Sequence, residues 1–234
     1  MDDAFVTPLL VPISETRLDS YGTEYDNRQT RLSNYLWNIE LSQAFYPLLQ
    51  AFEVSFRNAV HHALCEHKQD ERWFEDDTFM LHDQISKVEE AKDTLSRRGK
   101  PPTTGRIVAQ LTFGFWTSLL NRPYEERVWH VGKPIVLLSA FPYLPKQRRT
   151  RKSMYGRAQL ANTLRNRIFH YEPIWNRLSL LAEHDKILDA LGWISPEMGR
   201  VVEFYDSFPE VYQRGPDQSH AGLLAYLDSR SIQT

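Results

Sequence analysis

Apolar residues recur at steps of three and four along several stretches of this 234-residue chain. That spacing places them on one face of an α-helix. The stretches cover residues 41–63, 81–95, 107–120 and 154–171. Runs of alternating β-branched residues, which would indicate strands, are missing from the sequence. We therefore expect an all-α fold, a helical bundle with additional peripheral helices.

Prolines and apolar patterns set the expected limits of these helices. Pro47 lies inside the first stretch and predicts a kink or a break there. The stretch 107–120 is apolar on nearly all sides, which is typical of a central buried helix. A long helix is expected from residue 146 to about 171, because Pro173 disfavours helix for the residue before it. Three further helices are expected. One covers 176–191, one begins at the N-cap with proline at 195–197, and one covers about 218–229.

The length of the chain suits one large domain or two small ones. Residues 1–28 are mixed in character and contain proline, so we expect a loosely ordered arm followed by a single all-α domain over 29–234. The only cysteine, Cys65, excludes an internal disulfide, and a buried inert thiol is expected. Together with the lack of an apolar signal segment, this indicates a reducing, cytoplasmic location. The longest apolar runs, such as 135–140, are far too short for a membrane span.

Charge is distributed unevenly along the chain. The formal net charge is only −2, yet the 45 residues from 127 to 171 contain ten basic residues and no acidic one. The remainder carries 18 basic and 30 acidic residues. A basic segment on an acidic body fits a polyanion partner such as RNA. It fits equally a solvated basic helix face that docks on the protein's own acidic surface.

The stretch TLRNRIFHYEPIW, residues 163–175, concentrates polar side chains near the end of the expected long helix. Asn166 and His170 are four residues apart and share a helix face, and Arg165 is long enough to reach their edge. Histidine moves protons near neutral pH, and a guanidinium binds phosphate and stabilises developing negative charge. An Arg–Asn–His cluster therefore suits phosphodiester chemistry. From spacing alone, the alternative is a solvated polar face near a helix end.

These three residues match the signature of the HEPN superfamily, in which a polar residue follows an arginine and a histidine comes four to six positions after that arginine. Two further segments narrow the resemblance: LTFGFW at 111–116 and FEVSFRNAV at 52–60. With the form RNRxxHxEP, they resemble the Abi-like branch, the abortive-infection proteins of bacteria. The resemblance covers about residues 30–195.

The resemblance implies a HEPN-type helical bundle that forms a homodimer, with the arginine and histidine of both copies lining one cleft. It implies a metal-independent endoribonuclease of phage-defence or toxin type, without a cofactor. In that chemistry the ribose 2′-OH attacks the adjacent phosphate and leaves a 2′,3′-cyclic phosphate. Carried over to this chain, His170 would handle protons, Arg165 would hold the phosphate and Asn166 would orient the cluster.

Further residues are expected around this site. Basic side chains on the same long helix are expected to follow the RNA backbone; they are Lys146, Arg148, Arg149, Arg151, Lys152, Arg157 and Arg167. Glu53, Arg57 and Asn58 are expected to support the cleft, with a direct RNA role or a plain surface pair as alternatives. Glu172, also counted as supporting, stands where family members with a nucleotidyltransferase antitoxin carry a modifiable tyrosine.

Other candidate sites are weaker. Three histidines lie near one another in sequence without a matching ligand set at zinc spacing, so no metal is expected; they are His61, His62 and His67. The aromatic residues Phe113, Phe115 and Trp116 have the rings to stack bases, but we expect them in the core. The sequence contains neither a phosphate-binding glycine loop nor a serine nucleophile elbow.

Two other functions stay open at this point. The same cleft in a non-catalytic module would hold RNA or a nucleotide without cutting it. In a protein-interaction subunit of a defence system, the basic segment 146–157 would dock an acidic partner. An antitoxin or a phage-derived trigger is a further class of partner that the resemblance leaves open.

Overall fold

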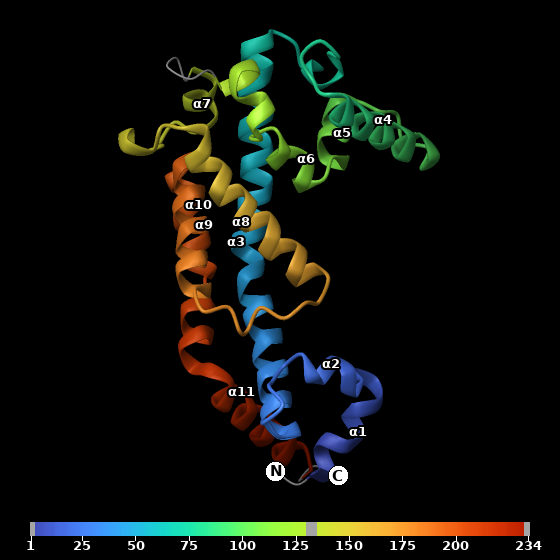
Figure 1. Ribbon diagram of the computed structural model, residues 1–234, viewed down its shortest axis with the longest axis vertical. Helices are drawn as coiled ribbons and strands as arrows, with labels where there is room; N and C mark the ends of the chain where they lie inside the picture. The colour runs from blue at the N-terminus through green and yellow to red at the C-terminus, as the bar shows by residue number, and fades with distance from the viewer. Residues whose placement is uncertain (1–2, 130–134, 232–234) are drawn as a thin grey trace. The chain divides into compact units, whose positions relative to one another are not determined.

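The structure of the protein is a computed structural model that describes residues 3–129 and 135–231. Every regular element in these two ranges is helical and none is a strand, so the all-α prediction is confirmed. No helix in the same ranges is long and apolar enough to cross a membrane. The α-helices (Figure 1) are α1 (Asp3–Ile13), α2 (Glu15–Asp19), α3 (Arg28–Lys68), α4 (His82–Arg97), α5 (Thr104–Gln110), α6 (Phe113–Ser118), α7 (Ile135–Ala140), α8 (Arg151–Phe169), α9 (Leu180–Ile194), α10 (Pro196–Tyr205) and α11 (Phe208–Ser231). The shorter turns are η1 (Trp73–Glu75), η2 (Arg122–Tyr124), the π-helical η3 (Glu125–Trp129) and η4 (Lys146–Arg148).

The chain divides into two compact units, each with more contacts within itself than with the other. Unit 1 comprises Met1–Pro47, Leu164–His184 and Tyr205–Thr234. Unit 2 comprises Leu48–Thr163 and Asp185–Phe204. The prediction of a single domain over 29–234 stays a prediction.

The N-terminal segment of unit 1, expected to be loosely ordered, contains two helices. Val6 of α1 and Leu18 of α2 are buried together with Leu32 of α3. Figure 1 shows α1 and α2 beside the first part of α3. Prolines at positions 8 and 12 masked the helical pattern of α1. Burial against α3 stabilises this segment, and tertiary packing of this kind overrides local propensity.

The core of unit 1 joins α3, α9 and α11. The ring of Phe45 lies 4.3 Å from that of Phe208, between centroids, and the His184 imidazole stacks on Phe208 at 4.6 Å. The indole of Trp37 donates a 2.9 Å hydrogen bond to the carbonyl of Val211. Aromatic contacts of this kind add to the free energy gained from burial alone. They fix the part of α3 that faces the candidate site.

The core of unit 2 is rich in aromatic rings. Phe56 of α3 lies 5.7 Å from Phe52, 5.9 Å from Phe113 and 5.8 Å from Phe141, between ring centroids. Phe113, Phe115 and Trp116 are each no more than 2% exposed. The prediction that this aromatic group belongs to the core is therefore confirmed.

One expected helix is wrong, and one of the two alternatives at Pro47 is excluded. The stretch 107–120 is not one helix, because α5 ends at Gln110 and α6 begins at Phe113. Thr112 caps α6 by accepting a hydrogen bond of 3.4 Å from the amide of Phe115, so the chain restarts there. α3 continues through Pro47 without the break that was one of the two expectations.

The limits of α8 and α9 are close to those expected. α8 begins at Arg151 rather than 146, after the turn η4, and α9 begins at Leu180. Ser195 caps α10, its hydroxyl accepting from the amide of Met198 at 3.1 Å, as predicted. α11 starts ten residues before the expected 218 and is interrupted at Gly215, where φ is 73°. A glycine tolerates that left-handed conformation.

Candidate functional site

The motif lies where α8 ends, and the way the helix ends is unusual. The amide of Tyr171 donates to the carbonyl of Ile168 at 3.0 Å, and that of Glu172 donates to Arg167 at 2.7 Å. This pair of bonds is a Schellman motif, which needs a left-handed residue at the position of Tyr171. Tyr171 has φ of 59°, although glycine is the usual residue there. The sequence therefore places a strained tyrosine directly after His170.

The three residues of the motif are only partly brought together. Arg165 donates a weak hydrogen bond of 3.4 Å to the side-chain oxygen of Asn166, and its guanidinium lies 4.8 Å from the centre of the Phe169 ring. His170 follows the last helical residue, and its amide donates to the carbonyl of Asn166 at 2.9 Å. Among the described residues, no hydrogen bond joins the imidazole to either partner. Asn166 and His170 are exposed, which leaves both accessible to a ligand.

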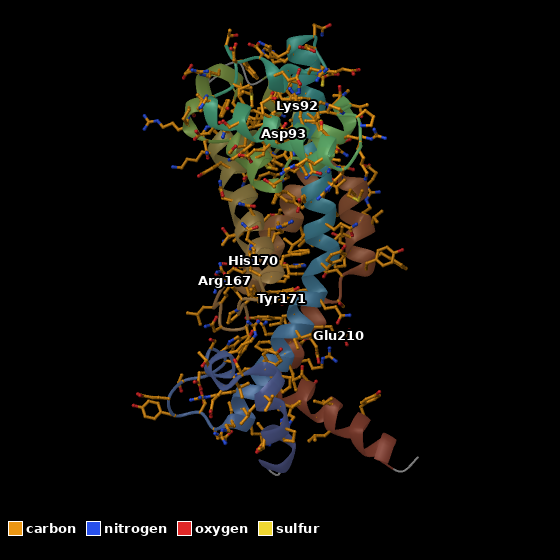
Figure 2. All side chains as sticks on the ribbon, turned by 90° about the vertical axis from the view of Figure 1, so that its right-hand side faces the viewer. Lys92, Asp93, Arg167, His170, Tyr171 and Glu210 are labelled. Carbon is orange, nitrogen blue, oxygen red and sulfur yellow. The ribbon has the colours of Figure 1, made fainter. Side chains whose placement is uncertain are left out.

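Arg167 and Glu172 hold the chain that leaves the helix. The Nε of Arg167 donates to the carbonyl of Pro173 at 3.2 Å and lies 3.7 Å from the Glu172 carboxylate. Figure 2 shows Arg167, His170 and Tyr171 together at this end of α8. A supporting role for Glu172 through this local pair is compatible with the geometry. Arg167 keeps donors for a phosphate because a guanidinium has five N–H groups.

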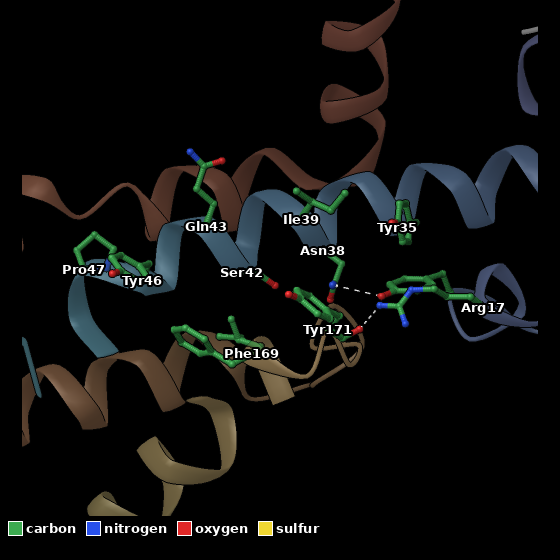
Figure 3. Close-up of a pocket in the computed structure, with 12 residues that line it drawn as sticks. Arg17, Tyr35, Asn38, Ile39, Ser42, Gln43, Tyr46, Pro47, Phe169 and Tyr171 are labelled. Atoms are coloured by element: carbon green, nitrogen blue, oxygen red, sulfur yellow. Dashed lines mark hydrogen bonds between the residues drawn. The ribbon is translucent and has the colours of Figure 1, made fainter. Parts of the chain in front are cut away.

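A pocket of about 850 Å³ opens beside the motif, entirely within unit 1 (Figure 3). Residues of α2 and the turn after it, of α3 and of the end of α8 form its walls; they are Arg17, Tyr21, Tyr35, Asn38, Ile39, Ser42, Gln43, Tyr46, Pro47, Ile168, Phe169 and Tyr171. The guanidinium of Arg17 donates to the carbonyl of Tyr171. Burial raises the pKa of the Tyr21 phenol, and Arg17 only partly offsets that rise. No carboxylate is among these lining residues.

A buried amide connects the pocket wall to the segment after the motif. The side-chain oxygen of Asn38 accepts from the amide of Ile174 at 2.7 Å and from that of Trp175 at 3.1 Å. Its side-chain nitrogen donates to the Tyr21 hydroxyl at 3.4 Å. Asn38 is only 5% exposed, so these bonds replace water that the backbone amides would otherwise need. They fix where the chain runs after His170.

The other six basic residues expected to bind RNA fall into two groups. Arg151 and Arg157 are half-buried and have internal partners. Arg151 donates to the carbonyl of Leu120 and lies 3.2 Å from Glu125, while the Arg157 guanidinium lies 4.0 Å from the centre of the Trp193 ring. Burial, with the nearby positive charge of Arg148, lowers the pKa of Arg157. The side chains that remain exposed are Lys146, Arg148, Arg149 and Lys152.

The expected supporting residues of α3 lie in unit 2. Arg57 donates from its Nε to the side-chain oxygen of Asn58 at 3.2 Å. Glu53 and Arg57 are half-buried, and Asn58 is exposed. The motif itself belongs to unit 1, so the support of the cleft by these three residues stays a prediction.

The histidines of α3 have structural surroundings. His61 accepts a 3.1 Å hydrogen bond from the Trp73 indole, and burial lowers its pKa. Burial also raises the pKa of the half-buried Cys65 thiol, which disfavours the reactive thiolate. Within the described ranges, no group of three or more His, Cys, Asp or Glu side chains is arranged to hold a metal ion.

Sequence reasoning missed the pocket and its charged residue. Arg17 lies 154 positions before Tyr171, inside the segment expected to be a loose arm. Tyr46 and Phe169 are about half exposed and their rings lie 6.3 Å apart, between centroids. No spacing in the sequence links these residues. The one available signal is the unusual Tyr171 in place of a glycine at a helix end.

Comparisons with protein-family models, with curated proteins and with solved structures find no match to this chain. The resemblance to the Abi-like branch of the HEPN superfamily therefore stays a prediction carried by the motif.

Proposed function

We propose that this chain is a metal-independent endoribonuclease with a HEPN-type bundle, acting as a toxin or in phage defence. The observation that carries the proposal is the arrangement at the end of α8. Arg165 and Asn166 are joined by a hydrogen bond, and the exposed His170 follows one turn later. This is the residue set that transfer of a phosphodiester to an internal hydroxyl needs.

The chemistry requires one proton acceptor, one proton donor and one cationic group. His170 removes the proton of the ribose 2′-OH, whose oxygen then bonds to the adjacent phosphorus. The bond from phosphorus to the 5′-oxygen breaks, and the leaving oxygen takes a proton from an imidazolium. The products are a 2′,3′-cyclic phosphate and a 5′-hydroxyl. Arg165 stabilises the extra negative charge on the phosphoryl oxygens, and such a contact strengthens as the charge develops.

Four exposed cations support binding along the RNA backbone: Lys146, Arg148, Arg149 and Lys152. We assign Arg151 and Arg157 mainly to the stability of unit 2, because they are half-buried against internal partners. Arg148 and Arg149 also have internal contacts, with Trp193 and with the Leu144 carbonyl, but they stay exposed. RNA affinity then falls with salt, with a slope of log K against log salt near −0.7 per phosphate contact on a single strand.

A homodimer is part of the proposal, with two copies of the motif facing one cleft. Leu178 is 101% exposed and Leu181 is 39% exposed, and both follow the motif in unit 1. A contiguous patch of exposed apolar side chains marks an interaction surface, and these two leucines are candidates for one. Light scattering on the purified chain tests this part, and a monomer at all concentrations argues against a shared cleft.

A non-catalytic RNA-binding module is the second candidate. It is favoured by one observation: within the described part of the chain, the His170 imidazole has no hydrogen bond to Arg165 or Asn166. Binding without scission needs only the arginines and the pocket. Tight RNA binding with no cleavage under any condition supports this candidate over the enzyme.

The deciding experiment compares the wild-type protein with His170→Ala on labelled structured and single-stranded RNA in the presence of EDTA. His82→Ala is the matched control, because His82 is an exposed histidine of α4 in unit 2. We expect cleavage with cyclic-phosphate ends by the wild type and the control variant, and none by His170→Ala. Equal cleavage by all three proteins refutes the assignment of His170. Arrest of bacterial growth by the wild type and not by His170→Ala tests the toxin role.

A further inference from the structure

We infer that the pocket of unit 1 holds an unpaired nucleobase of the RNA strand, stacked on Tyr171 and adjacent to the phosphate at His170. The inference rests on the proposed function, because it assigns a binding site for the same RNA. It goes beyond that function by naming what the enzyme recognises next to the scissile bond. It also gives a role to Arg17, which lies outside the motif.

Exposed aromatic rings at the pocket are the first observation. Tyr171 is 74% exposed, Tyr46 is 49% exposed and Phe169 is 45% exposed, and all three line the pocket. Large rings left open to water together indicate a surface that another molecule covers. Bases stack on such rings without regard to sequence, with a gain of roughly 5- to 100-fold in affinity for each base.

The backbone that carries the Tyr171 ring is held in place before any ligand arrives. Its backbone is fixed in the left-handed region by the two bonds of the Schellman motif and by the donor of Arg17 to its carbonyl. Figure 3 shows the ring pointing toward Ser42 of α3, so it lies across the pocket and not away from it. A non-glycine residue in this conformation is strained, and such strain clusters at binding sites.

The charge of the pocket favours a nucleotide over an apolar peptide. Arg17 contributes a guanidinium, and no carboxylate is among the lining residues. A guanidinium has five N–H groups, so Arg17 keeps donors for a phosphate or a base carbonyl beside its bond to the Tyr171 carbonyl. The Ser42 hydroxyl, which both donates and accepts, faces the same space. The volume of about 850 Å³ lies within the range of about 300–1,000 Å³ typical of small-ligand sites.

The position of the pocket relates it to the motif. Phe169 and Tyr171 are the neighbours of His170 in sequence, and both line the pocket. A base stacked there belongs to a nucleotide whose phosphate lies near the imidazole. The pocket therefore selects for single-stranded or looped RNA, because a base in a duplex is not available for stacking on protein.

The test measures RNA binding in a His170→Ala parent, which does not cut its ligand. The probes are a labelled single-stranded oligoribonucleotide and the same oligomer with one abasic position. Tyr171→Gly removes the ring and leaves the left-handed backbone favourable, whereas Tyr171→Phe keeps the ring. Tyr25→Ala is the control, because Tyr25 is 89% exposed in the same unit and does not line the pocket.

We expect Tyr171→Gly to lose between about 5- and 100-fold in affinity for the intact oligomer, and Tyr171→Phe to lose less than about 3-fold. The abasic oligomer is expected to bind the parent and Tyr171→Gly equally. Arg17→Gln should lower the affinity and reduce the slope of log K against log salt by the value of about one phosphate contact. Arg200→Gln, which changes an exposed arginine of α10, should do neither.

The outcomes separate this inference from the proposed function. If Tyr171→Gly binds both oligomers like its parent while cleavage still depends on His170, the pocket inference is wrong and the ribonuclease stands. If base-dependent binding at Tyr171 is found but no RNA is cut, the pocket stands and the catalytic proposal is wrong. If the parent binds no RNA and an apolar peptide protects Tyr171 from modification, the base assignment is overturned.

Discussion

Two substitutions of Tyr171 test the strained end of α8 independently of any ligand. Tyr171→Ala and Tyr171→Gly remove the same ring. They differ in one respect, because alanine still has a Cβ that crowds the backbone when φ is 59°. That crowding costs roughly 1–2 kcal/mol, and glycine avoids it. The glycine variant should therefore be more stable than the alanine variant by about 1 kcal/mol.

The comparison with the wild type follows from exposure. Tyr171 is 74% exposed, so about a quarter of the residue's area, or roughly 50 Å², is removed from water. At about 25 cal/mol per Å², its loss costs about 1 kcal/mol. In the glycine variant this loss is offset by the relief of strain, and stability should lie within about 1 kcal/mol of the wild type. In the alanine variant nothing offsets the loss.

Urea unfolding followed by the helical circular dichroism signal measures the difference. With slopes of about 1–3 kcal/mol per M, the midpoints of the two variants should differ by roughly 0.3–1 M. Equal midpoints for glycine and alanine refute the left-handed conformation of Tyr171. They would also remove the argument that the backbone carrying the ring is held in advance for a base.

Three further predictions concern stability. Asn38→Ala leaves the amides of Ile174 and Trp175 without their acceptor, so it should lower the free energy of unfolding by about 2–5 kcal/mol. Asn166→Ala, at an exposed position, should change that free energy by less than about 0.5 kcal/mol. Urea unfolding measures both. Arg157→Ala should lower it by about 1–2 kcal/mol through loss of the contact with Trp193, while Lys152→Ala should weaken RNA binding and leave stability unchanged. Hydrogen bonds from Thr78, and then Lys68, lower the pKa of Asp76 to about 2, so its charged form stabilises the fold; this contribution is complete above the unfolded-state pKa of about 4 and is lost as the pH falls through about 2. Thermal unfolding of Asp76→Asn should therefore depend less steeply on pH between about 4 and 2 than that of the wild type, and identical slopes would contradict the shift.

Helical periodicity predicted what depends on burial. The spacing of apolar residues identified the long helices, and the apolar run 107–120 identified the aromatic core residues Phe113 and Trp116. The cap at Ser195 came from a local signal, a serine followed by proline. Burial repeats with the period of the helix, so it is visible in one sequence. The break at Thr112 was missed because a threonine cap inside an apolar run changes the chain direction without changing the apolar pattern.

The partners of charged side chains could not be predicted in the same way. Arg151 and Arg157 lie in the same basic segment as Lys152, and nothing in the sequence distinguishes them from it. In the structure, Arg151 contacts Glu125 and Arg157 contacts Trp193, both inside unit 2. Whether an arginine binds RNA or its own protein depends on which groups the fold brings within reach. That is a property of tertiary structure. A basic segment in the sequence does not distinguish arginines that bind RNA from arginines that contact their own protein.

The rigidity of the candidate site comes from the segment after the motif as much as from α8 itself. Arg17 holds the carbonyl of Tyr171, Arg167 holds that of Pro173, and Asn38 holds the amides of the two residues that follow. His170 is the last residue before this anchored run, so its position depends on contacts from α2 and α3. A helix end alone frays, whereas a helix end tied at several points does not. Substitutions of Arg17 and Asn38 should therefore change the chemistry at His170 through its position, without any contact of their side chains with the imidazole.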